Sequence, residues 1–362
     1  MFINGGCAAV RIIIFDDPGR LRQRGTRELE APVLAFAPSH PYSGHRTWPH
    51  NHAPENKPSR LNAALRLVVG SDGKADMVFQ HGRFAWYELI TTDIADAKAF
   101  YAGVLGWGAQ DVSTSDLAYS FFTAASGPVG GLIELPEDAR KMGAAPRWLG
   151  YVSVNDVDAA AKLIARLGGT VYVAPTDSNI GRIAVVADPQ TAIVALVKGL
   201  KFGQPQPAGL NEPGHVGWHE LLAADWENAF AVYRELFGWQ KVDAAPDPAN
   251  AYQLFSAGGQ TAGGIFTKLP IEPFPYWLYY FNVGDIDTAT ERVKAGGGVV
   301  FADLHELTDG SWVARCTDPQ GAIFALQGKR RDGIVRAGAR DVGWSSEWSG
   351  ISSRGRLVRP RG

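Results

Sequence analysis

Glu88 and Glu220 are the polar residues whose sequence surroundings best fit a chemical role. Glu88 lies in the apolar segment FAWYELIT and Glu220 in VGWHELLA, 132 residues further along. Because side chains alternate across a β-strand, each glutamate shares a face with a tryptophan, Trp86 or Trp218. A carboxylate in an aromatic-walled cavity has a raised pKa and could act as a general base or hold a cationic or hydroxyl-bearing ligand. Alternatively, each glutamate accepts hydrogen bonds from neighbouring strands and only stabilises the sheet.

Four tryptophans are candidates for the walls of a ligand site: Trp86, Trp218, Trp148 and Trp277. Aromatic side chains in strands also form hydrophobic cores, so both interpretations stay open. His219 stands one residue off the Trp218 face, so its side chain is predicted to point away from that face. Cys316 has no recognisable motif around it and is predicted to be a small core residue.

An internal repeat shows which elements must position these side chains. Residues 84–112 align without gaps on residues 216–244, and the similarity continues from 147–199 to 276–328. The repeat predicts two homologous domains, residues 81–200 and 214–328, joined by a linker at 201–213 that contains Pro and Gly.

Each predicted domain divides again into two halves with the order strand, helix, three strands. In the first half, FAWYELIT predicts a strand, Asp93 the N-cap of a helix and Gly106 its end. In the second half, WLGYVSV predicts the strand and Asp156 the N-cap. The predicted fold class is therefore α+β, with four βαβββ modules across residues 81–328.

Composition indicates a soluble globular protein, with 46% hydrophobic and 20% charged residues. The sequence shows no apolar run of membrane-spanning length and no secretory signal, and its two cysteines cannot form a disulfide framework, so we expect a cytoplasmic location. The formal charge is -2, but residues 77–328 hold 16 basic and 27 acidic residues. We therefore expect neither nucleic acid nor a membrane as partner.

The flanks differ from the repeat region. Residues 1–76 are rich in Pro, His and polar residues, and residues 329–362 form a basic tail rich in Arg, Gly and Ser. Both are predicted to be disordered because they lack the apolar density to bury a core. Met77 precedes the first module, which raises the hypothesis that the natural polypeptide begins there.

The segments WYELITTDIADAKAFYAGVLGW and WHELLAADWENAFAVYRELFGW, with the later GGLIELP and VADPQTAIVAL, resemble the vicinal oxygen chelate superfamily. That superfamily includes glyoxalases, extradiol dioxygenases and bleomycin-resistance proteins. The resemblance covers about 250 of the 362 residues and implies tandem glyoxalase-like domains whose paired modules form open β-cups. Because single-domain relatives dimerise to complete their cups, it also implies that two fused domains can pair within a monomer.

In metal-dependent members, one ligand lies in the first strand of each module and another near the last strand. The first-strand positions correspond here to Trp86, Leu149, Trp218 and Leu278, and the last-strand positions to Glu134, Ala195, Lys268 (or Thr267) and Ala325. Among them only Glu134 is a usual ligand of a divalent metal. The resemblance therefore predicts a lost metal site and no cofactor, with a Zn, Fe, Ni or Mn ion as the alternative.

The expected function is small-molecule binding in a β-cup, without a metal. The expected ligand is apolar or aromatic and neutral or cationic, held by Trp86, Trp218, Glu134, Trp148 and Trp277. The alternative is a metal-dependent lyase or ring-cleaving dioxygenase. If the protein is an enzyme, Glu88 and Glu220 are the candidate catalytic residues.

Overall fold

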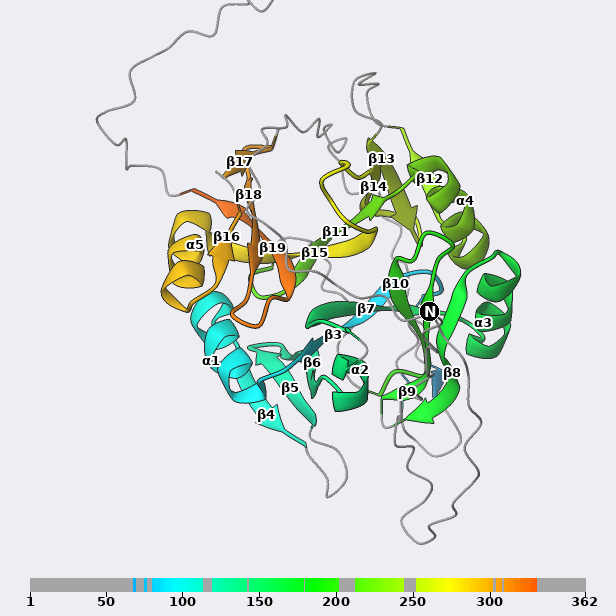
Figure 1. Ribbon diagram of the computed structural model, residues 1–362, viewed down its shortest axis with the longest axis horizontal. Helices are drawn as coiled ribbons and strands as arrows, with labels where there is room; N and C mark the ends of the chain where they lie inside the picture. The colour runs from blue at the N-terminus through cyan, green and yellow to red at the C-terminus, as the bar shows by residue number, and fades with distance from the viewer. Residues whose placement is uncertain are drawn as a thin grey trace, which may run out of the picture. The chain divides into compact units, whose positions relative to one another are not determined.

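The computed structural model describes residues 68–69, 75–76, 80–112, 119–141, 143–178, 180–201, 212–243, 252–301, 304–307 and 309–330 (Figure 1). The predicted N-terminal arm lies outside these residues except for β1 (Val68–Val69) and β2 (Ala75–Asp76), which pair antiparallel. Met77 and residues 331–362 also lie outside them. Within the described ranges, no helix has the length and apolar character needed to cross a membrane.

The first domain forms one eight-stranded sheet with the order β4-β5-β6-β3-β7-β10-β9-β8. Its two halves join where β3 pairs antiparallel with β7. Within each half the first and last strands are parallel, β3 with β6 and β7 with β10. The sheet is open, with β4 and β8 at its ends. Its strands are β3 (Phe84–Thr91), β4 (Gly108–Asp111), β5 (Tyr119–Ala124), β6 (Gly127–Glu134), β7 (Arg147–Ser153), β8 (Thr170–Ser178), β9 (Gly181–Ala187) and β10 (Ile193–Lys198).

The second domain repeats this plan in a nine-stranded sheet. The order is β12-β13-β14-β11-β15-β19-β18-β16, and β17 pairs with β18. The predicted α+β fold of four modules is therefore confirmed. The strands are β11 (Val216–Ala223), β12 (Gln240–Val242), β13 (Tyr252–Ala257), β14 (Gln260–Thr267), β15 (Tyr276–Asp285), β16 (Val299–Val300), β17 (His305–Glu306), β18 (Trp312–Thr317) and β19 (Ile323–Lys329).

The helix of each module begins on an aspartate N-cap, as predicted for Asp93 and Asp156. The Asp93 carboxylate accepts a hydrogen bond from the Asp96 N–H at 2.9 Å, and the helix ends at Gly106 in the left-handed region, with φ 71°. The module helices are α1 (Ile94–Leu105), α3 (Val157–Arg166), α4 (Trp226–Phe237) and α5 (Ile286–Ala295). A short helix, α2 (Glu137–Lys141), was not expected from the sequence.

One face of each sheet packs into a hydrophobic core that the two domains share. This core includes residues from both β3 and β15, among them Leu89 and Phe281. Helix α1 contacts α5, and α3 contacts α4, so each domain supplies one helix to each pair (Figure 1). The opposite face of each sheet carries a separate, smaller hydrophobic cluster, and we call this face the cup of that domain.

Buried polar contacts join the domains in a symmetric pattern. The Tyr101 hydroxyl of α1 donates to the Asp318 carboxylate at 3.1 Å, and the Tyr233 hydroxyl of α4 donates to Asp188 at 3.0 Å. The indole of Trp107 donates to the Gly214 carbonyl at 2.9 Å. The duplicated sequence therefore makes equivalent contacts twice, and the two domains pair within one chain.

The two domains differ at positions where counterparts in the repeat contact each other. Tyr87 and His219 are counterparts in the repeat, and the Tyr87 hydroxyl lies 2.6 Å from His219 Nε2. Burial lowers the pKa of His219 to about 4. The Tyr279 hydroxyl accepts a hydrogen bond from the N–H of its counterpart, Gly150, at 2.8 Å. His219 therefore points away from its cup, as predicted, but into the interdomain core.

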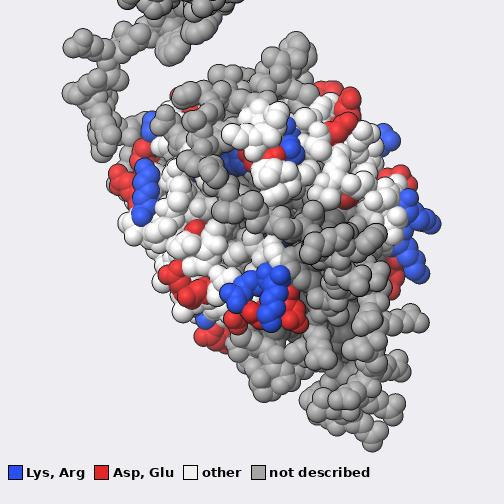
Figure 2. All heavy atoms as spheres, viewed as in Figure 1, with Lys and Arg blue, Asp and Glu red and all other residues white. Residues whose placement is uncertain are grey.

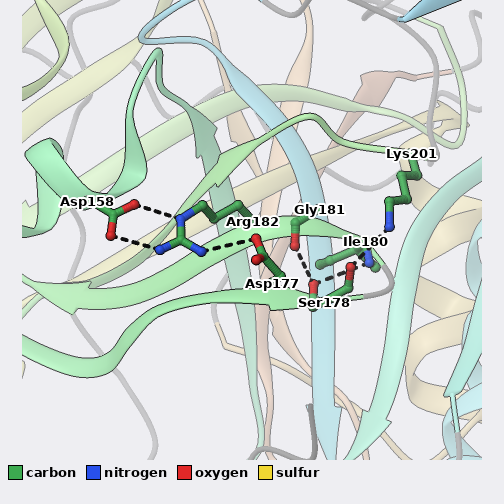
Figure 3. Close-up of polar contacts among 7 residues, drawn as sticks. All are labelled: Asp158, Asp177, Ser178, Ile180, Gly181, Arg182 and Lys201. Atoms are coloured by element: carbon green, nitrogen blue, oxygen red, sulfur yellow. Dashed lines mark hydrogen bonds and ion pairs between the residues drawn. The ribbon is translucent and has the colours of Figure 1, made fainter. Parts of the chain in front are cut away.

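Arg182 braces the edge of the first sheet (Figure 3). Its guanidinium donates to Asp158 of α3 at 2.6 and 2.8 Å and to Asp177 of β8 at 3.1 Å. Beside it, the Ser178 hydroxyl donates to the Gly181 carbonyl at 2.7 Å. These contacts tie the β8–β9 hairpin to α3. Elsewhere in the described surface, acidic and basic side chains are intermixed on the face shown in Figure 2.

Candidate functional site

The first cup is the sheet face that carries Trp86, Glu88, Leu149, Tyr151 and Ala195. Strand register places these residues together, because Trp86 pairs with Tyr151, Glu88 with Leu149, and Ala195 with Tyr151. The Tyr151 hydroxyl donates to the Glu88 carboxylate at 2.8 Å. Burial raises the pKa of Glu88, although hydrogen bonds with Tyr151 and Tyr119 oppose that rise.

The second cup is the corresponding face, with Trp218, Glu220, Leu278, Tyr280 and Ala325. The Tyr280 hydroxyl donates to the Glu220 carboxylate at 2.8 Å. Burial raises the pKa of Glu220 to about 7, against the opposing effects of hydrogen bonds with Tyr280 and Tyr252 and of the nearby Arg315. Each cup therefore holds a buried glutamate that two tyrosines contact.

A tryptophan completes each cluster. In the second cup, the Trp218 indole donates to the Tyr252 hydroxyl at 3.0 Å. In the first cup, Trp86 and Glu88 both act on the pKa of Tyr119, which burial raises well above its usual value. The repeat thus carries a Trp, Glu and two Tyr into both cups.

Two glycines make room for these clusters. A Cβ on Gly131 would lie 2.2 Å from the Tyr119 hydroxyl oxygen and 3.1 Å from Glu88 Oε1. A Cβ on Gly264 would likewise lie 2.3 Å from the Tyr252 hydroxyl oxygen. These two glycines therefore let a tyrosine from β5 or β13 cross the neighbouring strand and reach the glutamate.

The structure separates the predicted ligand-binding residues. Trp86 and Trp218 lie in the cups, but Trp148 and Trp277 lie in the shared core on the opposite sheet face. There their indoles donate to the hydroxyls of Tyr101, at 2.9 Å, and Tyr233, at 3.2 Å. The sequence interpretation of these two tryptophans as cup walls is therefore corrected.

Glu134 also lies outside the cup. At the end of β6, Glu134 pairs with Thr91. It lies two positions from Leu132 and therefore on the same strand face, whereas Gly131 and Ile133 face the cup. Its side chain is exposed. The assignment of Glu134 to the ligand site is corrected, because strand alternation places it on the wrong side. Cys316 is buried and free, as predicted.

The cups differ in accessibility. Trp86 is 2% exposed and Tyr119 is 3% exposed. In the second cup, Trp218, Tyr252 and Tyr276 are all partly exposed. The aromatic side chains of the second cup are therefore more exposed than those of the first.

The cups also differ in the position of their arginine. Arg315 of β18 pairs with Ala325 and so belongs to the second cup, whereas the equivalent position of the first cup is Val185, paired with Ala195. Arg315 Nη1 lies 2.8 Å from Glu272 Oε1, and its guanidinium lies 5.4 Å from the centre of the Tyr276 ring. The sequence did not point to Arg315 and Glu272, because neither residue is shared between the two copies of the repeat.

The donor set does not fit a catalytic metal. Such a site normally takes at least three protein donors, whereas the strand face of each cup contributes one carboxylate already hydrogen-bonded by tyrosine. Ala195 and Ala325, at the last-strand positions, face the cups without a donor atom. Among the residues that the structure describes, no three His, Cys, Asp or Glu side chains are grouped to hold a metal ion.

Tandem domains of paired βαβββ modules with open sheets define the class of this protein. The model of the Glyoxalase/Bleomycin resistance protein/Dioxygenase superfamily matches residues 83–194 and 213–326. The chain belongs to this superfamily, as the sequence resemblance indicated.

Similar proteins cover the same two-domain region. A Mycobacterium tuberculosis protein named as a glyoxylase, CFP32, is 31% identical over 253 residues, covering 68% of this chain and 95% of its own length. The anthracycline biosynthesis protein DauV of Streptomyces sp. strain C5 is 31% identical over 268 residues, covering 68% of this chain and 94% of its own. The Mn(II)-bound glyoxalase from Novosphingobium aromaticivorans shares the fold at a TM-score of 0.50 and 15% identity, covering 70% of this chain and 84% of its own.

Proposed function

We propose that this protein binds an apolar or aromatic small molecule in a β-cup and needs no metal to do so. The observation that carries the proposal is the repeated cluster in which a buried glutamate, held by two tyrosines, lies beside a tryptophan on the cup face. Aromatic walls supply most of the contact area of small-molecule sites, and a few placed polar groups orient the ligand.

The name of one relative, DauV, agrees with an aromatic ligand. Anthracyclines are polycyclic aromatic compounds, and DauV is named for their biosynthesis. Its similarity to this chain covers 94% of its own length. The name of DauV states no ligand, so the supporting argument for binding remains the cup itself. A flat ring can lie against Trp218 and Tyr276, which are partly exposed.

A second candidate function is acid–base catalysis without a metal. The pKa of Glu220, about 7, allows this group to gain or lose a proton near neutrality. Its contact with the Tyr280 hydroxyl at 2.8 Å would hold the carboxylate in place. If this function holds, the protein will speed deuterium exchange at the methyl group of 2-acetonaphthone in D₂O, and Glu220→Gln will abolish that effect.

Isothermal titration calorimetry with 2-acetonaphthone tests the proposed binding function. The titration compares protein treated with EDTA and then desalted with untreated protein, and uses acetone as the non-aromatic control ketone. We expect saturable binding of 2-acetonaphthone with the same Kd in both preparations. Binding that appears only after Zn, Fe, Ni or Mn is restored would overturn the proposal in favour of a metal-dependent site.

A further inference from the structure

We propose that the second cup is the ligand site and that its ligand is a neutral planar aromatic carrying both a carbonyl oxygen and a hydroxyl group. This inference rests on the proposed binding function and specifies its location and ligand class. It follows from the placement of Arg315 and Glu220 on one cup face and from the greater exposure of the aromatic residues there.

Arg315 supplies hydrogen-bond donors to the second cup. Its register partner Ala325 pairs in turn with Tyr280, which contacts Glu220. The guanidinium is close enough to act electrostatically on Glu220. Its side chain is 25% exposed, and a guanidinium has only N–H donors, in a fixed planar arrangement. A ligand group facing Arg315 must therefore be a hydrogen-bond acceptor, such as a carbonyl oxygen.

Glu272 argues against a fully charged ligand. Its carboxylate forms a mostly enclosed ion pair with Arg315, and its side chain is 12% exposed. A carboxylate ligand would compete with Glu272 for the guanidinium and would also face Glu220. A neutral carbonyl oxygen can accept from the guanidinium without displacing Glu272, whereas bringing a second carboxylate into this enclosed site costs desolvation and repulsion.

Glu220 selects a hydroxyl group on the ligand. A carboxyl group can accept a hydrogen bond from a hydroxyl when ionised and can also donate to it when protonated. The tyrosine contact orients Glu220, and its side chain is 1% exposed. The partly exposed rings of Trp218 and Tyr276 leave aromatic surface beside these polar groups.

The first cup lacks this combination. Val185 takes the place of Arg315 in the first cup. The arginine of the first cup is Arg147 of β7, whose counterpart in the second cup is Tyr276 of β15. Arg147 Nε donates to the nearby Ala145 carbonyl at 3.1 Å. Trp86 and Tyr151 are each 2% exposed. The first cup therefore holds its glutamate without the Arg315–Glu272 ion pair that the second cup contains.

Calorimetry with three related naphthalenes tests the inference. The probes are 6-hydroxy-2-acetonaphthone, which carries both groups, 2-acetonaphthone, which lacks the hydroxyl, and 6-ethyl-2-naphthol, which lacks the carbonyl. Wild-type protein is expected to bind the first about tenfold more tightly than either of the others, since each lost hydrogen bond costs about 1–1.5 kcal/mol. Equal affinity for all three would overturn the inference and leave the proposed function standing.

Matched variants locate the site. The double variant Arg315→Val, Glu272→Gln removes both partners of the ion pair, so no charge is left buried alone. It should lose the preference for 6-hydroxy-2-acetonaphthone over 6-ethyl-2-naphthol, which is the carbonyl preference. Glu220→Gln should reduce the preference for 6-hydroxy-2-acetonaphthone over 2-acetonaphthone, which is the hydroxyl preference. Glu88→Gln, the matched change in the first cup, should leave both preferences intact.

The outcomes separate the inference from the function on which it rests. Retention of the carbonyl preference in the folded double variant, or its loss in Glu88→Gln, would overturn the assignment to the second cup. If the double variant does not fold, the comparison of Glu220→Gln with Glu88→Gln decides the location. If none of the three probes binds wild-type protein, both the proposed function and this inference fail.

Discussion

Glu220→Gln tests whether burial in the second cup destabilises the ionised carboxylate. The pKa of Glu220 is raised from 4.5 to about 7, and the largest cause is burial. Glutamine resembles the protonated acid in shape and can still accept hydrogen bonds from tyrosine hydroxyls. The substitution therefore removes the ionisation while retaining the packing.

The sign of the expected pH dependence follows from the direction in which folding shifts the pKa of Glu220. Because the folded protein binds the Glu220 proton more tightly than the unfolded chain, the resulting stabilisation is complete below pH 4.5. It is lost as the pH rises through about 7. A displacement of about 2.5 pH units corresponds to about 3 kcal/mol. The free energy of unfolding of Glu220→Gln minus that of the wild type should therefore be larger at pH 8.5 than at pH 4.5, by about 3 kcal/mol.

Urea denaturation of both proteins at several pH values between 4.5 and 8.5 measures this difference. Subtracting the wild-type from the variant free energy of unfolding cancels other titrating groups, including Asp318, whose pKa burial raises to about 6. Glu88→Gln provides a second comparison and should show the same sign, because burial raises the pKa of Glu88 too. A difference that does not change with pH, or that favours the wild type at high pH, would refute the reasoning.

Three further predictions concern the packing of the cups, the domain interface and metal removal. Gly131→Ala should destabilise the protein by about 1–3 kcal/mol in urea denaturation, because its Cβ would lie 2.2 Å from the Tyr119 hydroxyl oxygen. Gly103→Ala on α1, where a Cβ meets nothing within 4 Å, should be neutral or stabilising, and an equal loss in both variants would contradict the packing argument. Tyr101→Phe should lower the free energy of unfolding by about 1–3 kcal/mol, because Asp318 loses a donor and the Trp148 indole loses its acceptor. The equivalent Tyr233→Phe should lower it by a similar amount, and no loss of stability in either variant would contradict the role of these contacts. EDTA treatment should leave the Tm unchanged by scanning calorimetry, whereas a fall that Zn or Mn reverses would indicate a structural metal.

The repeat predicted the fold well because each copy contains several short sequence patterns that indicate where strands and helices begin and end. Segments at the same offset carried a strand, an aspartate N-cap and a terminal glycine, and each signal acts over a few residues. Alternation along one strand also placed Glu88 correctly beside Trp86. These inferences needed no knowledge of how strands meet.

The cup residues were harder to predict because they depend on register between strands. Trp148 and Glu134 were assigned to the cup by type, but each lies one residue away from a cup-facing neighbour, Leu149 or Ile133. Tyr151 did recur in the repeat, and that recurrence was the available signal for a partner of Glu88. Arg315 had no such signal, since its importance lies in its difference from Val185.

The most direct test of the central claim is a crystal structure of the EDTA-treated protein with 6-hydroxy-2-acetonaphthone. We expect the ring to lie against Trp218, with its carbonyl oxygen within hydrogen-bond distance of Arg315 and its hydroxyl beside Glu220. Absence of an anomalous metal signal in crystals of protein that binds the probe would agree with metal-independent binding. A probe bound only in the first cup, or a metal ion bridging the probe to protein donors, would contradict metal-independent binding in the second cup.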